Sequence, residues 1–98
     1  MEIIISSVAE NEIEEIRNSL GSDGFELSDR FHLDVLQTLR YIAQFPGGVQ
    51  IRSKMYRYAP LQAFRYHLIY SIEGEVAVVH RIRHMHQRPL RRYFGRQG

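Results

Sequence analysis

Residues 64–84 read FRYHLIYSI-EGE-VAVVHRIRH, and this stretch decides the fold. Two runs rich in β-branched and aromatic residues flank a short segment with a central glycine, which is the pattern of a β-hairpin. We therefore predict strands at Phe64–Ile72 and Val76–His84, joined by a tight turn at Glu73–Gly74. The run Val76–Val79 is apolar on both faces, so the second strand is expected in the interior of the sheet.

The hairpin leads into a strongly basic segment. No acidic residue follows Glu75, and six arginines fall within residues 81–96: Arg81, Arg83, Arg88, Arg91, Arg92 and Arg96. Residues 1–45 carry a balance of −6 (three basic, nine acidic) and residues 46–98 one of +8 (ten basic, two acidic), which gives the net charge of +2. Two halves of opposite charge can attract each other and solvate the surface. A cluster this dense nevertheless favours a polyanionic or acidic partner.

Length and composition limit the possible classes of protein. The chain has 98 residues, 44% of them apolar, and no cysteine. Residues 1–98 are therefore expected to form one domain with one core. Without cysteine there is no disulfide framework or thiolate chemistry, which suits a reducing compartment such as the cytoplasm. The N-terminus lacks a basic leader, and no apolar run approaches about 18 residues, so neither a signal peptide nor a membrane span is predicted.

Two helices are predicted before the hairpin. Residues 1–6 are expected to form a short strand, and the capping-box pattern Ser7-Val8-Ala9-Glu10 predicts the start of a first helix that ends at Gly21. A second helix of about 20 residues is expected from the segment 22–26 to Pro46-Gly47-Gly48. Apolar residues at helical spacing predict the buried faces: Val8, Ile13, Ile16 and Leu20 in the first helix, and Leu27, Phe31, Val35, Leu36, Leu39, Ile42, Ala43 and Phe45 in the second.

The period changes from helical to alternating after the glycines. Val49–Met55 is predicted to be a half-buried strand, and Pro60 predicts a loop or bulge at Ala59–Ala63. The expected class is α+β, in the order strand, helix, helix, strand, strand, strand. Two antiparallel helices would pack on one face of a small, mainly antiparallel sheet and leave the other face open.

Three segments of the chain resemble the RelE/ParE superfamily of small bacterial toxins. The first is Ser28-Asp29-Arg30-Phe31, which leads into the long helix that ends Gln44-Phe45-Pro46. The second is Phe64–Ile72, similar to a strand that commonly begins aromatic-Pro-Tyr where this chain has Phe64-Arg65-Tyr66. The third is Val78–His84, a strand that ends in a basic stretch, with Pro89 five residues later. The order of elements is also similar, and the resemblance covers nearly the whole chain.

The resemblance implies a toxin of a type II toxin–antitoxin (plasmid stabilisation) system, which inhibits growth in the cytoplasm. A cognate antitoxin protein would neutralise it in a toxin–antitoxin hetero-oligomer. ParE-like members act on DNA gyrase without known nuclease chemistry, whereas RelE-like members cut mRNA on the ribosome. The spacing of Arg81 and His84 and the long helix pair are closer to ParE-like members, and His67 stands where RelE-like nucleases carry arginine. A small basic nucleic-acid-binding domain or an inactive toxin remnant is a further alternative.

The candidate site residues follow from these two chemistries. Cleavage of a phosphodiester needs proton transfer and charge stabilisation, which suit histidine and arginine. The catalytic candidates, for a RelE-like enzyme only, are Arg65, His67, Arg81 and Arg83. The binding candidates are Lys54, Arg57, His84, His86, Arg88, Arg91 and Tyr93.

Other residues are assigned structural or partner-binding roles. His84 and His86 have the spacing of a shared metal site, but no third ligand lies near them in the sequence, so neither a metal nor a cofactor is expected. His80 is interpreted as a packed strand histidine. Tyr56 and Tyr58 are expected to stack on a base or to pack under an antitoxin helix. The antitoxin is predicted to use an amphipathic helix and an extended acidic segment, and an exposed edge at Val49–Met55 or at the C-terminal strand could accept one of its strands.

Overall fold

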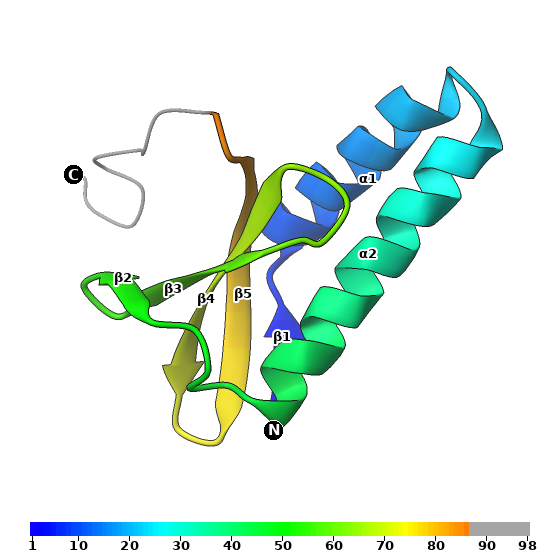
Figure 1. Ribbon diagram of the computed structural model, residues 1–98. Coiled ribbons are helices and arrows are strands. Elements are labelled where there is room, and N and C mark those ends of the chain that lie inside the picture. The colour runs from blue at the N-terminus through cyan, green and yellow to red at the C-terminus, as the bar shows by residue number, and fades with distance from the viewer. Residues whose placement is uncertain (87–98) are drawn as a thin grey trace.

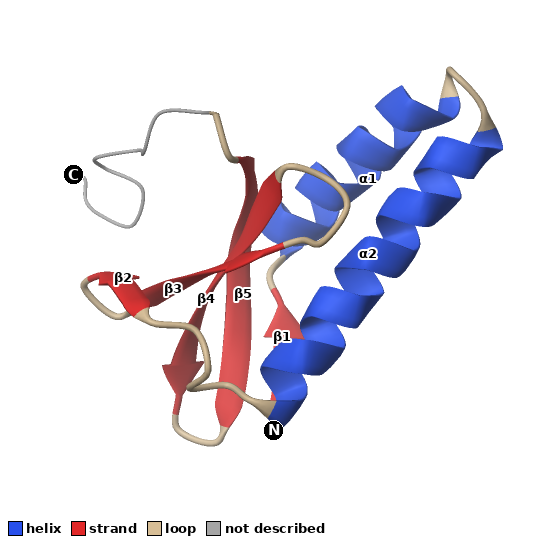
Figure 2. Cartoon of the chain, viewed as in Figure 1, coloured by secondary structure: helices blue, strands red, loops and turns tan. Residues whose placement is uncertain are grey.

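Figure 1 shows the computed structural model of the chain, which describes residues 1–86. Its elements are β1 (Glu2–Ile5), α1 (Ser7–Gly21), α2 (Phe25–Gln44), β2 (Ile51–Ser53), β3 (Tyr56–Pro60), β4 (Tyr66–Glu73) and β5 (Val76–His84). The strands form one sheet in the order β1-β5-β4-β3-β2. β1 pairs with β5 in parallel, and the other neighbouring strands pair antiparallel. Both helices lie on one side of the sheet (Figure 2), which confirms the α+β class.

The central hairpin confirms the prediction most closely. β5 has the predicted bounds, and its first part, Val76–Val79, lies between β1 and β4 as an interior strand. Glu73 pairs with Val76 across a turn in which Gly74 has φ 65°, a left-handed conformation that glycine adopts without strain. β4 begins at Tyr66, two residues later than predicted, because the amide of Phe64 bonds to α2 instead of to a strand.

The segment before the hairpin differs from the prediction of one half-buried strand at Val49–Met55. The strand there, β2, is three residues long and exposed throughout. The chain turns at Lys54, which has φ 54°, and then forms β3, including two residues predicted as a loop. Pro60 is tolerated because it ends β3, beyond the stretch that pairs with β2. An alternating pattern does not reveal such a turn, because the residues on both sides of it alternate in the same way.

Both helices form where expected, with corrections at their ends and faces. The side chain that caps α1 belongs to Ser6 and not to Ser7: its Oγ accepts from the amide of Ala9 at 3.1 Å. The side chain of Val8, predicted to be buried, is 49% exposed. α2 has 20 residues, as predicted, but no side chain caps its N-terminus.

The core lies between the helices and the sheet. Phe31, Val35 and Ile42 of α2 pack with Leu68 and Tyr70 of β4, among others. Three residues of the predicted face of α2 are instead exposed: Leu27, Leu36 and Phe45. Three polar residues of α2 are buried in their place: Ser28, Asp34 and Thr38. The apolar residues of α2 therefore occupy a wider arc than the core can cover.

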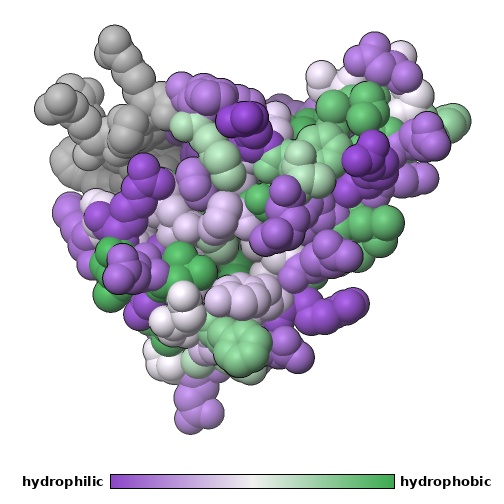
Figure 3. Space-filling model, in the orientation of Figure 1, coloured by the Kyte–Doolittle hydropathy of each residue, from purple (hydrophilic) through white to green (hydrophobic). Residues whose placement is uncertain are grey.

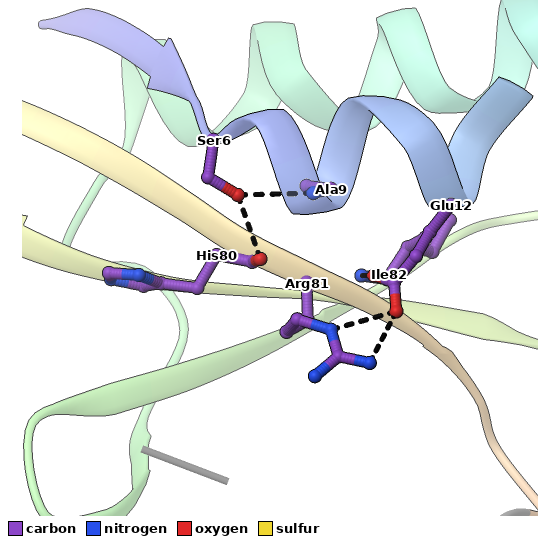
Figure 4. A network of polar contacts seen from close by, with 6 residues as sticks. All are labelled: Ser6, Ala9, Glu12, His80, Arg81 and Ile82. Atoms are coloured by element: carbon purple, nitrogen blue, oxygen red, sulfur yellow. Dashed lines mark hydrogen bonds and ion pairs between the residues drawn. The ribbon is translucent and has the colours of Figure 1, made fainter. Parts of the chain in front are cut away.

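β5 contains a bulge at His80. Tyr70 of β4 pairs with Val79, and the preceding Ile69 pairs with Arg81, so His80 is the extra residue of β5 at this point. Ser6 fixes this point of the strand, since its amide donates to the Val79 carbonyl and its hydroxyl to the His80 carbonyl, both at 2.9 Å. The same hydroxyl caps α1, so the helix start and the bulge are joined through one side chain (Figure 4).

Candidate functional site

A row of cationic and aromatic side chains crosses the helix-free face of the sheet. His67 and Arg83 are direct cross-strand partners, and residues opposite each other in a sheet point to the same side. The ring of Tyr58 lies edge-on to His67, with ring centroids 5.7 Å apart. The guanidinium of Arg52 lies 4.7 Å from the centre of the Tyr58 ring, a cation–π contact. We call Arg52, Tyr58, His67 and Arg83 the basic–aromatic row.

The electrostatics of the row favour an anionic or planar ligand. Burial lowers the pKa of His67 below its ordinary value of 6.5, and the positive charge of Arg52 lowers it further. The imidazole is therefore neutral at pH 7, while the guanidinium groups of Arg52 and Arg83 stay charged. Guanidinium groups bind phosphate or carboxylate, and the faces of aromatic rings stack on bases or pack against a protein partner.

The helix-free face is not open at its centre, in contrast to the prediction. Ile69 and Ser71 of β4 point to this face and have no exposed surface. The Oγ of Ser71 donates to Glu73 Oε2 at 2.7 Å and lies 2.8 Å from His80 Nε2. Because the hydroxyl has a single proton, which goes to Glu73, the nitrogen of His80 is the donor of the second bond. A serine this deeply buried cannot attack a substrate, so the three side chains form a structural network, and His80 is a packed strand histidine as predicted.

Arg81 forms an ion pair with a residue of α1. Figure 4 shows the side chains of Glu12 and Arg81 pointing toward each other beside β5. Arg81 donates to Glu12 Oε2 through Nε, at 2.8 Å, and through Nη2. The other oxygen, Oε1, accepts from the amide of Ile82 at 3.0 Å. The predicted catalytic residue Arg81 is thus already bound to a carboxylate of its own chain.

The structure separates the remaining candidates from the row. Arg65 is exposed just before β4, and its carbonyl accepts from the amide of Met85. Lys54 lies in the turn between β2 and β3, and Arg57 donates to the carbonyl of Val49. The ring of His84 contacts the rings of Tyr66, on the helix-covered face, and of His86. Arg88, Arg91 and Tyr93 lie outside the described residues.

Sequence reasoning found His67 and Arg83 and expected Tyr58 to stack or to pack against a partner, but it missed Arg52 and did not bring Tyr58 together with His67. Arg52 and Tyr58 come from β2 and β3, where the predicted elements were wrong, so their positions could not be inferred. The register of β3 against β4 would have placed Tyr58 beside Ile69 and diagonal to His67. No sequence signal connects Glu12 to Arg81, which lies 69 positions away.

Further observations concern metal ligands, membrane-spanning helices, cavities and the surface. Within residues 1–86, no three His, Cys, Asp or Glu side chains are grouped so that they could hold a metal ion. In the same range, no helix combines the length and the apolar character needed to cross a membrane.

A cavity of about 470 Å³ lies between α2 and β3, lined by Gln37, Thr38, Tyr41, Val49, Ala59, Pro60 and Gln62. Figure 3 shows apolar side chains in separate patches on a largely hydrophilic surface.

Comparisons with known proteins bear on the fold. No protein-family model matches the sequence, and no curated protein does. The structure is similar to a solved structure described as "Chromosomal ParDE TA system from P. aeruginosa", with a TM-score of 0.73 and 15% sequence identity. The match covers 86% of this chain and 95% of that chain. The chain therefore has the fold of a chain from a ParDE toxin–antitoxin system.

Proposed function

We propose that this chain is the toxin of a type II toxin–antitoxin system and that it is ParE-like. In this proposal it acts in the cytoplasm, inhibits growth by binding a cellular target such as DNA gyrase, and is neutralised by a cognate antitoxin in a hetero-oligomer. The observation that carries the proposal is the shared fold, which extends over nearly the whole of both chains. Systems of this kind contribute to plasmid stabilisation.

The arrangement of the site supports binding more than catalysis. A ribonuclease needs a base, an acid and a charge-stabilising group around one phosphate. His67 and Arg83 lie together, but Arg81 is bound to Glu12 and Arg65 lies outside β4. The row nevertheless offers stacking and anion binding on one surface, which suits an acidic protein surface.

A RelE-like ribosome-dependent mRNA endoribonuclease is the second candidate, and the basic–aromatic row favours it. Its neutral imidazole could accept a proton from a 2′-OH, and Arg83 beside it could bind the phosphate. A nucleic-acid-binding domain or an inactive remnant is the further alternative. In that case the row would bind nucleic acid but would neither cleave it nor arrest growth.

Induced expression in bacteria, with and without the product of the adjacent gene, tests the proposal. A ParE-like toxin arrests growth, the neighbouring protein reverses the arrest, and the purified chain inhibits gyrase supercoiling while mRNA stays intact. Ribosome-dependent mRNA cleavage that is lost in His67→Gln and Arg83→Gln would instead establish the nuclease. Normal growth on expression would leave only the nucleic-acid-binding domain or the remnant.

Arg40→Gln is a matched control for these variants. Arg40 is exposed on α2, far from the helix-free face in the fold, and its substitution removes the same charge as Arg83→Gln. Arrest that is weakened by Arg83→Gln and not by Arg40→Gln assigns the effect to the row. Equal weakening by both would mean that only the total positive charge matters.

A further inference from the structure

We propose that the edge of β5 at Arg81 and Ile82 is a binding site for a carboxylate of an extended, acidic segment of a protein partner. Glu12 occupies this site in the free chain and is displaced when the partner binds. The inference rests on the proposed function for the identity of the partner, which is the antitoxin.

The first observation is that β5 is longer than its outer neighbour. β1 pairs with Val76–Val79 only, while β5 continues to His84. Beyond Val79 the chain of β1 turns at Ser6 into α1, so among the described residues a helix and not a strand borders this part of the edge (Figure 4). Beyond Val79, some backbone groups of β5 point away from β4 and toward α1. The amide of Ile82 is one of them, because it donates to Glu12.

The second observation is that this edge already binds a carboxylate. Both oxygens of Glu12 are used: one accepts from the backbone amide of Ile82 and the other from two nitrogens of Arg81. An amide beside a guanidinium is a charge-assisted site whose donors fit a planar anion. Glu12 thus identifies the chemical group that the site recognises.

The third observation is that the site can be reached and exchanged. The side chains of Arg81 and Glu12 keep 27% and 21% of their surface exposed. Because solvent reaches the ion pair and screens it, the pair is weaker than a fully buried one, and a competing carboxylate can displace Glu12. A cavity of about 330 Å³ lies here, lined by Glu12, Glu15, Ile16, Tyr66, Arg81, Ile82, Arg83 and His84.

The charges around the cavity determine how the partner binds. Arg83 attracts an acidic segment, but Glu15 also lines the cavity and would repel an additional carboxylate. The partner's carboxylate must therefore replace Glu12 and cannot be added beside it. An extended segment suits the position because it can lie over the cavity beside α1, from which one of its side chains reaches the amide of Ile82 and the guanidinium of Arg81.

A peptide-binding experiment tests the site without the antitoxin. A fluorescent peptide that alternates Glu and Val is titrated against the full chain, with a Gln–Val peptide for comparison. Glu12→Gln keeps an oxygen for the amide of Ile82 but removes the competing charge, so it should tighten binding of the Glu peptide about tenfold. Arg81→Gln should weaken this binding by a similar factor.

Glu14→Gln is the matched control for the peptide experiment. Glu14 is exposed on the same helix, does not line the cavity, and its substitution changes the net charge equally. Equal tightening by Glu14→Gln and Glu12→Gln, or equal binding of the Glu and Gln peptides, would overturn the proposal. Circular dichroism confirms that each variant is folded.

Hydrogen exchange in the toxin–antitoxin complex gives a second test. In Glu12→Ala the amide of Ile82 should exchange rapidly in the free chain and become protected when the antitoxin binds. If this amide stays unprotected in a complex that still neutralises growth arrest, the inference is wrong and the proposed function stands. If the chain does not arrest growth but binds the Glu peptide through Arg81, the proposed function is wrong and the carboxylate site stands.

Discussion

The carboxylate of Asp34 on α2 accepts a hydrogen bond from the backbone amide of Ala63 at 2.8 Å. The neighbouring amides of Gln62 and Phe64 also donate to this carboxylate, at 2.9 and 3.0 Å. One side chain, only 4% exposed, therefore satisfies three backbone donors of the loop between β3 and β4. The helix layer determines the shape of the loop from which the central hairpin starts.

Asp34→Ala should destabilise the chain by about 3 kcal/mol, because it leaves buried amide groups without an acceptor and removes charge-assisted bonds. Urea unfolding followed by circular dichroism measures the effect. Asp29→Ala, an exposed acidic position on the same helix, should change the free energy of unfolding by less than about 0.5 kcal/mol. Similar losses in the two variants would contradict the assigned role of Asp34.

Ser6→Ala should cost about 1–2 kcal/mol, since it removes the N-cap of α1. It also removes the donor to the His80 carbonyl. Ser7→Ala should be nearly neutral, because Ser7 is exposed and inside the helix. Thermal unfolding of the two variants distinguishes the observed cap from the capping box predicted at Ser7, which would give the opposite order of stabilities.

Gly48→Ala should destabilise the chain by about 1 kcal/mol through crowding. A Cβ at Gly48 would lie 2.8 Å from the hydroxyl of Tyr41 and 3.1 Å from the carbonyl oxygen of Phe45. At Gly47 a Cβ would meet nothing within 4 Å, so Gly47→Ala should be neutral or stabilise by up to about 1 kcal/mol. Chemical denaturation of the pair checks this, and equal stabilities would show that Tyr41 and Phe45 adjust without cost.

Acid should destabilise the fold through two histidines. Burial lowers the pKa of His67 and His80 below 6.5; Arg52 adds to the effect at His67, and Glu73 partly offsets it at His80. The unfolded chain then binds protons at a higher pH than the folded chain, so this contribution to stability is complete above pH 6.5 and decreases as the pH falls below it.

The melting temperature measured from about pH 8 to about pH 5.5 tests the dependence on these groups. The double variant His67→Gln, His80→Gln should show a smaller decrease over the same range. If the double variant and the original chain lose equal stability, other groups cause the acid sensitivity.

The sequence was sufficient for the elements whose signals are local. The hairpin was found because its turn needs a glycine and its strands are β-branched and aromatic, and α2 was found because its apolar residues repeat at helical spacing. The turn at Lys54 was missed because a non-glycine residue with positive φ carries no sequence signal. The burial of Asp34 was missed because its three partners lie 28 to 30 residues away.

The candidate site was predicted in part for the same reason. His67 and Arg83 are brought together by the hairpin itself, whose register follows from its turn, so both could be chosen from the sequence. The pairing of Arg81 with Glu12 and the stacking of Arg52 on Tyr58 depend on how α1 and β2 dock on the hairpin. Such contacts between distant segments require the assembled fold.

The extra residue at His80 changes the parity of β5. Before it, the odd-numbered Ala77 and Val79 face the helices; after it, the even-numbered Ile82 does so. If His80 paired regularly and formed no bulge, the alternation from Val79 onward would present Arg81 and Arg83 to the core and Ile82 to the solvent. The positive charge of the helix-free face therefore depends on the bulge, which absorbs one extra residue and keeps every following side chain of β5 on its observed face.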